Sequence, residues 1–155
     1  MKLGLFLLFL VVSQFSWAQD FDDDGFEIVN PGPSEVVLEQ INAIYEKEIQ
    51  PIFQSKCLNC HGQIESLPWY SIIPGVSHLI ERDIREAQKA MNMKDGFPFK
   101  GHGSVKDDLT ALRRVVDKKS MPPLQYKLLH WKSSLSDNEA VVIKTWIDLA
   151  HRKLE

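Results

Sequence analysis

Cysteine is scarce in this sequence. The 155 residues include only two, Cys57 and Cys60. A disulfide between them would close almost no loop, so it would restrict the unfolded chain little and add little stability. A structural zinc site usually needs four ligands, and there is no second cysteine pair to supply them. A thioredoxin-like redox pair is expected beside a βαβ pattern, which the surrounding sequence lacks. The two cysteines therefore need another explanation.

The sequence also lacks an excess of basic residues. Lysine and arginine together number 18 against 21 aspartates and glutamates, a formal net charge of −3 at pH 7. Nucleic-acid-binding surfaces carry clustered positive charge, so this balance argues against nucleic acid as a partner. The sign of so small a charge says little more about partners.

Long apolar runs are missing as well, apart from a short one at the N-terminus. Lys2 precedes an apolar run over residues 3–12, and the small residues Ser16 and Ala18 follow it. This order is typical of a secretory signal peptide, whose apolar stretch spans about 7–15 residues. A membrane anchor normally needs roughly 20 apolar residues. We therefore predict that residues 1–18 are a cleaved signal peptide, and that the chain is exported to the bacterial periplasm with no stable membrane span.

The rest of the chain reads as a leader followed by one domain. Residues 19–33 are acidic and rich in glycine and proline, with no sustained period, which predicts a flexible leader. Residues 34–155 have the length of one domain.

Alternation of polar and apolar residues, the pattern of a half-buried strand, never lasts more than a few positions. Apolar residues recur instead at helical spacing, which predicts an all-α domain of about four helices. Ser34 caps the first helix, and Pro51 is expected to kink or break it. The prolines of residues 121–133 predict an extended or turning segment. The other helices are predicted over residues 76–93, over residues 104–119, and after a capping box at Ser136 and Glu139.

The two cysteines lie in the sequence Cys57-Leu58-Asn59-Cys60-His61, which is the c-type haem attachment signature. Two thiols three positions apart on a tight helical turn can each reach one vinyl group of the same porphyrin. The adjacent imidazole then faces the iron from one side. This kind of attachment takes place on the exported side of the membrane, in agreement with the signal peptide. We therefore predict one covalent haem c, bound through Cys57, Cys60 and His61.

The iron has a second axial position, for which we predict Met121. The Met-Pro-Pro segment 121–123 lies between two predicted helices, and its prolines restrict the chain that carries the sulfur. A methionine paired with a histidine raises the reduction potential, as in cytochromes c. The alternative is that Met121 fills a gap in the core. His151 suits the end of the last helix by its charge and is assigned a structural role. The rival ligands are Met91, Met93, His78, His102 and His130.

Several stretches resemble known haem proteins. The segment over residues 49–62 is similar to the haem entry of monohaem cytochrome c domains, and residues 121–123 with the last helix are similar to their axial-methionine loop and C-terminal helix. Between them, Leu67-Pro68-Trp69-Tyr70-Ser71 and the helix after it resemble a narrower group. This group is the exported bacterial "haem-binding domain" family, with a CxxCH…PWYS…MPP pattern. The resemblance covers about residues 36–149 and leaves the loop DGFPFKGHGSVKDD unmatched.

The resemblance implies a cytochrome c-like fold wrapped around one covalent haem, and occasional association with cytochrome c peroxidase-type proteins. Trp69 and Tyr70 belong to the matching pattern. Their polar atoms suit a wall of the haem site or a hydrogen bond to a haem propionate. The alternative is that they are core aromatics in a turn.

These observations favour an electron carrier over an enzyme, with a six-coordinate iron that passes single electrons to a redox partner. The sequence has one haem signature, one candidate axial methionine and no second catalytic group. The first alternative is a haem enzyme or gas- or peroxide-responding domain with an open distal site, where His102 or His130 would be the polar group. The second is a haem module that docks to a peroxidase partner.

Covalent attachment can be tested by mass. Protein made with a haem-attachment system should exceed the polypeptide mass by one haem, because each thiol forms a thioether bond. The double substitution Cys57→Ala and Cys60→Ala should abolish the increase in intact mass. Haem that extracts into acidified organic solvent from the native protein would contradict covalent attachment.

Overall fold

A computed structural model describes residues 32–64 and 66–155. The predicted signal peptide and residues 19–31 of the predicted leader lie outside the described residues. Residues Gly32–Glu155 form one compact unit. The predicted all-α class is confirmed, since the described residues contain helices and no strand, only an isolated antiparallel bridge between Asn92 and Lys100. None of the helices in this described part is both long and apolar enough to span a bilayer.

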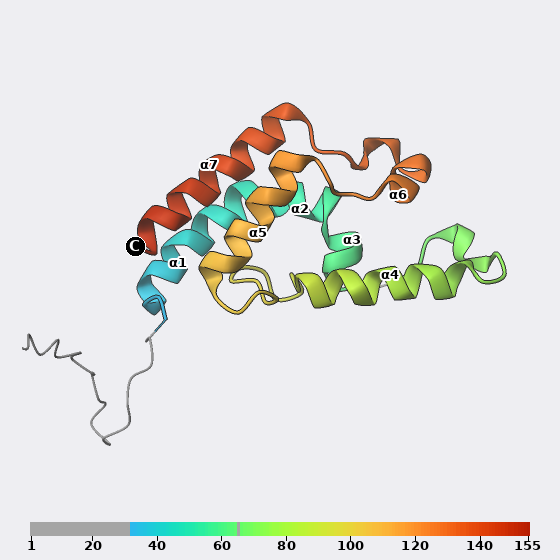
Figure 1. Ribbon diagram of the computed structural model, residues 1–155, viewed down its shortest axis with the longest axis horizontal. Helices are drawn as coiled ribbons and strands as arrows, with labels where there is room; N and C mark the ends of the chain where they lie inside the picture. The colour runs from blue at the N-terminus through green and yellow to red at the C-terminus, as the bar shows by residue number, and fades with distance from the viewer. Residues whose placement is uncertain (1–31, 65) are drawn as a thin grey trace, which may run out of the picture. The chain divides into compact units, whose positions relative to one another are not determined.

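Four longer helices correspond to the four that the sequence predicts. They are α1 (Glu35–Ile44), α4 (Val76–Ala90), α5 (Val105–Lys118) and α7 (Asp137–Lys153). The shorter elements are the π-helix η1 (Tyr45–Ile49), α2 (Gln50–Lys56), α3 (Leu58–His61), the 3₁₀-helix η2 (Trp69–Ile72), α6 (Leu124–Leu129) and the 3₁₀-helix η3 (Trp131–Ser133). Figure 1 shows α1, α5 and α7 side by side, with α4 extending away from them.

The chain does not break at Pro51, where the sequence predicts a kink or a break. The chain stays helical from α1 through η1 into α2, where Pro51 occupies the first turn. A proline cannot donate a backbone hydrogen bond, and its ring clashes with the carbonyl four residues earlier. In the π-helix before it, the N–H of Gln50 donates to the carbonyl of Tyr45, five residues back. This change of hydrogen-bond register accommodates the proline without ending the helix.

The segment after Met121 also differs from expectation, because α6 begins directly after Pro123. Proline disfavours a helix interior but is tolerated at its start, where the first N–H groups have no helical partner. Pro123 is the N-cap residue of α6 and lies outside its hydrogen-bonded turns. The predictions for the last two long helices are confirmed: Ser104 with Asp107, and Ser136 with Glu139, form complete capping boxes.

The core is a cluster of buried aromatic and aliphatic side chains. Tyr45 is buried at its centre, with the rings of four aromatic residues at centroid distances of 5.5 to 6.3 Å. Aliphatic side chains of α1, α5 and α7 pack around this cluster. The four aromatic residues are Phe53, Phe97, Phe99 and Trp146. Since Phe53 lies four residues before Cys57, this core fixes the start of the haem signature.

The capping box of α7 provides a stability test. The Ser136 hydroxyl accepts the N–H of Glu139 at 3.2 Å, and the Glu139 carboxylate accepts the N–H of Ser136 at 2.7 Å. Ser136→Ala should lower the free energy of unfolding by about 1 kcal/mol. Denaturant titration measures this, with Ser134→Ala, an exposed serine outside the box, as the matched control.

This capping contribution should depend on pH. The backbone N–H and the hydroxyl of Ser136 hold the pKa of Glu139 below its ordinary value of 4.5. The stabilisation is therefore present above pH 4.5 and is lost as the pH falls through the lower folded-state pKa. An equal effect of both substitutions, or a Ser136→Ala cost that grows in acid, would contradict the role of the box.

Candidate haem site

The haem signature lines a cavity of about 190 Å³, which we call the cysteine cavity. Cys57, Cys60 and His61 contribute to its wall from the α2–α3 corner. Met121 joins them from the loop between α5 and α6. Much of the remaining wall is apolar, supplied by Ala90, Ala111, Leu112, Val115, Pro122 and Pro123. The structure thus brings together the four residues that the sequence predicts as the principal haem contacts.

The two cysteines sit on a tight helical turn. The Cys57 N–H donates to the Phe53 carbonyl at 2.8 Å, and the His61 N–H donates to the Cys57 carbonyl at 3.0 Å. Burial, and then the neighbouring charge of Cys60, raises the pKa of Cys57 to about 12, while burial also raises the pKa of Cys60. Redox-active cysteine pairs have lowered thiol pKa values. These protonated thiols therefore differ from a thioredoxin-like pair.

One ring nitrogen of His61 forms a hydrogen bond within the protein. Its Nδ1 lies 2.8 Å from the carbonyl oxygen of Met91, and a carbonyl can only accept, so Nδ1 is the donor. The neutral ring therefore keeps its lone pair on Nε2. This second hydrogen bond is the usual means of orienting a metal-ligating histidine. The backbone supports it, since the Met93 N–H donates to the His61 carbonyl at 2.9 Å.

A side chain of α4 holds the end of the same turn. The Gln88 side-chain amide donates to the Gly62 carbonyl at 2.8 Å. Together with the contacts of Met91 and Met93, this hydrogen bond fastens the haem signature to the chain that returns after α4. Figure 1 shows α3 lying against α4.

Met121 lines the cysteine cavity but is not buried, with 46% of its surface exposed. A methionine that fills a gap in the core would be enclosed on all sides by protein atoms, whereas the Met121 side chain is partly open to solvent. The alternative role as a core residue is therefore disfavoured, and its thioether stands at the cavity wall.

His102 also lines the cysteine cavity, and a buried carboxylate holds it. Oδ1 of Asp108 accepts the backbone N–H of His102 at 2.8 Å and lies 3.0 Å from the ring Nδ1. Asp108 itself is buried. The carboxylate thus fixes the orientation of the ring, as happens around metal-ligating histidines.

The other rival ligands divide into two groups. Met91 and Met93 line the cysteine cavity and are buried. His78 is exposed on α4, His130 lines a neighbouring cavity, and His151 lies in the last turn of α7, where a positive charge is favourable.

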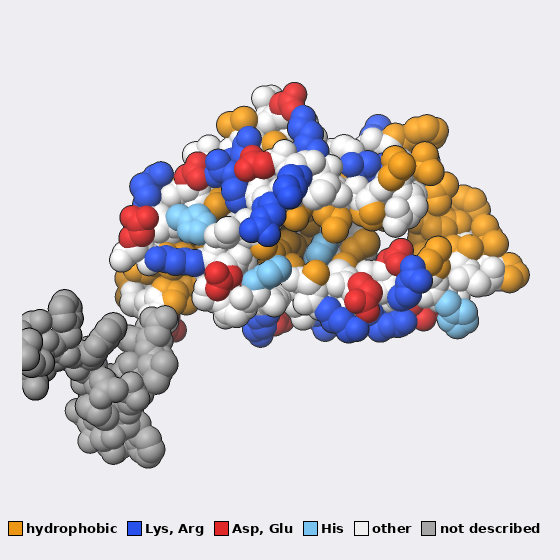
Figure 2. Space-filling view, viewed as in Figure 1, with side chains coloured by type: hydrophobic (Ala, Val, Ile, Leu, Met, Phe, Trp, Pro, Cys, Tyr) orange, Lys and Arg blue, Asp and Glu red, His pale blue; other side chains and the backbone are white. Residues whose placement is uncertain are grey.

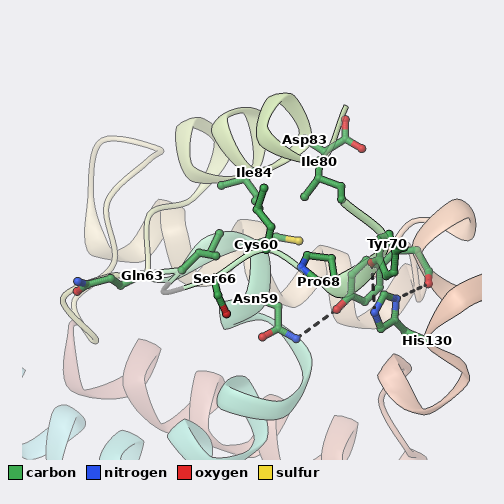
Figure 3. A pocket seen from close by; sticks show the side chains of 13 residues that line it. Asn59, Cys60, Gln63, Ser66, Pro68, Tyr70, Ile80, Asp83, Ile84 and His130 are labelled. Carbon is green, nitrogen blue, oxygen red and sulfur yellow. Dashed lines mark hydrogen bonds between the residues drawn. The ribbon is translucent and has the colours of Figure 1, made fainter. Parts of the chain in front are cut away.

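The neighbouring cavity, of about 440 Å³, contains Tyr70 and shares Asn59, Cys60 and Tyr126 with the cysteine cavity. We call it the tyrosine cavity. Figure 3 shows Tyr70 beside His130, whose Nε2 lies 3.4 Å from the tyrosine hydroxyl. Trp69 lines neither cavity and is 80% exposed, so it is not a core aromatic.

Sequence reasoning missed Tyr126. Its ring lines both cavities, its hydroxyl accepts a hydrogen bond from the Asn59 side chain at 3.2 Å, and it stacks on His130 at a centroid distance of 4.0 Å. The helix that carries it was predicted as an extended segment, so no helical face indicated where the ring would lie. The role of Asp108 was missed too, because an aspartate in the first turn of a helix is usually only a capping charge.

The donor set fits a haem. Two thiols stand beside an imidazole whose Nε2 is left with its lone pair, a thioether lies on the same cavity wall, and much of the rest is apolar. Histidine and methionine are established axial ligands of haem iron. These features define the class of the protein as a helical haem-binding domain.

The comparisons with known proteins agree with this class. The family model of the haem-binding domain matches residues 11–149, and the chain belongs to this family. It is 32% identical over 93 residues to the cytochrome c peroxidase Ccp of Escherichia coli (strain K12), which covers 59% of this chain. The chain spans only 20% of that relative's length. No solved structure matches it. The protein therefore binds haem.

Gly62 provides a test of the turn geometry. A Cβ at this position would lie 2.8 Å from the Leu58 carbonyl oxygen and 2.9 Å from the Leu58 Cβ. Gly62→Ala must therefore shift the turn that carries the cysteines and His61, and should lower the amount of haem bound per polypeptide. The ratio of haem absorbance to protein mass measures this. Gly32→Ala, at a position with no atom within 4 Å, is the control. Full haem loading of Gly62→Ala would show that the turn is not constrained.

Proposed function

We propose that this protein carries one covalent haem c and transfers single electrons outside the cytoplasm. The observation that carries the proposal is the convergence of Cys57, Cys60, His61 and Met121 on one cavity. The bound haem would supply a one-electron Fe(III)/Fe(II) couple. The chain's own residues would hold it, keep water away and tune its potential.

Each of these residues has a defined task in this proposal. The thiols of Cys57 and Cys60 would add across the two vinyl groups of the haem, so that each S–H hydrogen passes to a vinyl carbon as a thioether bond forms. His61 would offer Nε2 to the iron, because the Met91 carbonyl holds Nδ1. Met121 would offer its sulfur. A thioether opposite an imidazole raises the reduction potential, which suits an electron carrier.

The export of the chain is part of the same proposal. The signal peptide predicted over residues 1–18 would deliver the chain to the periplasm, where c-type haem is attached. The relative in Escherichia coli is a cytochrome c peroxidase, and this chain matches only a fifth of it. We propose that the redox partner of this chain is a peroxidase of that type, to which it passes electrons.

A second function is favoured by one observation. His102 faces the cysteine cavity with its ring oriented by Asp108, as a distal polar residue would be. If Met121 does not bind the iron, the site would be open to a small ligand, with His102 beside it. The protein would then respond to a gas or peroxide, or act on it.

Substitution of Met121 distinguishes these functions. Met121→Ala should lower the reduction potential, remove the weak sulfur-to-iron charge-transfer band of the oxidised form, and let carbon monoxide bind the reduced form. Absorption spectra and a redox titration measure all three. His102→Ala is the matched control and should leave the charge-transfer band in place. A native protein that already lacks the band and binds carbon monoxide would refute ligation by Met121, and the open-site function would then be favoured.

A further inference from the structure

An exposed apolar face extends over η2, α6 and η3. Figure 2 shows hydrophobic side chains gathered over these elements. Trp69, Ile72 and Trp131 are each at least 80% exposed. Large exposed apolar patches on soluble proteins mark interaction sites. We call this surface the η2–α6 face, and its residues are Trp69, Ile72, Ile73, Leu124, Leu128, Leu129 and Trp131.

The two halves of the η2–α6 face lie together although they are far apart in the sequence. Tyr70 in η2 is in edge contact with the ring of His130, which follows α6, at a centroid distance of 5.9 Å. His130 in turn stacks on Tyr126 within α6. These half-buried rings form a layer beneath the exposed residues, so the face is continuous.

The η2–α6 face lies outside both cavities. None of its seven residues lines the cysteine cavity or the tyrosine cavity. Within α6, Tyr126 faces the cavities, whereas Leu124 and Leu128 are exposed. The exposed apolar side chains are therefore left for another molecule.

The face is in contact with the haem signature through a short chain of side chains. Asn59, between the two cysteines, donates to the Tyr126 hydroxyl, Tyr126 stacks on His130, and His130 touches Tyr70. Trp69 on the face is in edge contact with Tyr70, at a distance of 5.7 Å between the ring centroids. A protein bound to the face would therefore lie close to the haem-bearing turn, as electron transfer between two proteins requires.

The charge beside the face indicates the chemistry of its occupant. Lys132 follows Trp131, is exposed, and forms no ion pair with any other described residue. Lys127 does not contribute, because its Nζ donates to the Lys119 carbonyl at 3.5 Å. Complementary charge favours a partner that carries a carboxylate opposite Lys132. A second copy of the chain is disfavoured, because a two-fold contact would place the two copies of Lys132 near one another. A bilayer is disfavoured because α6 has only six residues, far fewer than most helices that lie in a membrane interface.

We propose that the η2–α6 face is the docking surface for the redox partner, a peroxidase-type haem protein whose own contact surface is apolar and edged by carboxylates. This inference rests on the proposed electron transfer. The exposed tryptophan and isoleucine side chains act as anchors, because large side chains at the centre of an interface contribute most of the binding energy. Lys132 speeds association and gives it a dependence on salt.

The test uses the haem-loaded full chain and a purified bacterial dihaem cytochrome c peroxidase as the probe. Ile72→Ser combined with Trp131→Ser changes one residue in each half of the face, and neither residue lines a cavity. This variant should bind the peroxidase roughly tenfold or more weakly, as the loss of two anchors predicts. Val36→Ser removes a similarly exposed apolar residue of α1, outside the face, and should bind as the native protein does. Calorimetry at two salt concentrations measures both affinities.

Three results would overturn the docking surface. These are a native protein that does not bind the peroxidase, a double variant that binds as tightly as the native protein, and a double variant whose main defect is loss of self-association or of binding to anionic vesicles. Circular dichroism and the haem spectrum show that each variant is folded and loaded. A separate redox titration with small-molecule mediators tests the electron carrier itself. A protein that cycles by one electron in that titration but fails to bind the peroxidase would refute the docking surface alone.

Discussion

The hydrogen bond between His61 and the Met91 carbonyl joins two parts of the chain that are 30 residues apart in sequence. It determines which nitrogen of the imidazole is left for a metal, and it holds the ring at the wall of the cavity. The neighbouring backbone bond from Met93 and the side-chain bond from Gln88 act on the same turn. The haem signature is thus fastened to the segment that follows α4. Without that return of the chain, the CxxCH turn would have its two thiols but no fixed direction for its imidazole.

A second constraint comes from the core beside the site. The aromatic cluster around Tyr45 and the packing of α1, α5 and α7 use side chains of this chain alone. Leu112 belongs both to that core and to the wall of the cysteine cavity, so the site is built against an already packed surface. The residues of the candidate haem site lie at the edge of the core. This placement allows the cofactor to be shielded from water on one side and to stay near the molecular surface on the other.

The helix α6, only six residues long, lies between the cavities and the molecular surface. Its Tyr126 side faces the cavities, and its leucine side faces outward. An electron carrier needs this combination, because the cofactor must be held in an apolar site while a partner approaches closely. The same helix therefore links the proposed function to the proposed docking surface.

The local patterns of the sequence were sufficient for much of the fold. Helical spacing, the capping boxes at Ser104 and Ser136, and the absence of alternation predict the long helices, because these features act between residues within one or two turns of each other. The CxxCH signature is equally local, since attachment needs two thiols and an imidazole on one turn. The effects of proline were harder to predict. Pro51 was accommodated by a π-helix and Pro123 was placed at a helix start, and in both cases the outcome depended on hydrogen-bond register as well as residue type.

What the sequence determined by itself was the all-helical class and the CxxCH signature that marks the candidate haem site. The tertiary structure alone decided the arrangement around this site: that Met91 orients His61, that Asp108 orients His102, that Tyr126 joins the two cavities, and that Trp69 faces outward. The physical reason is distance along the chain. A cap or a haem signature is complete within a few residues. The Met91 carbonyl and the His61 imidazole meet only when the whole chain is packed, and so do the two apolar segments that share one surface.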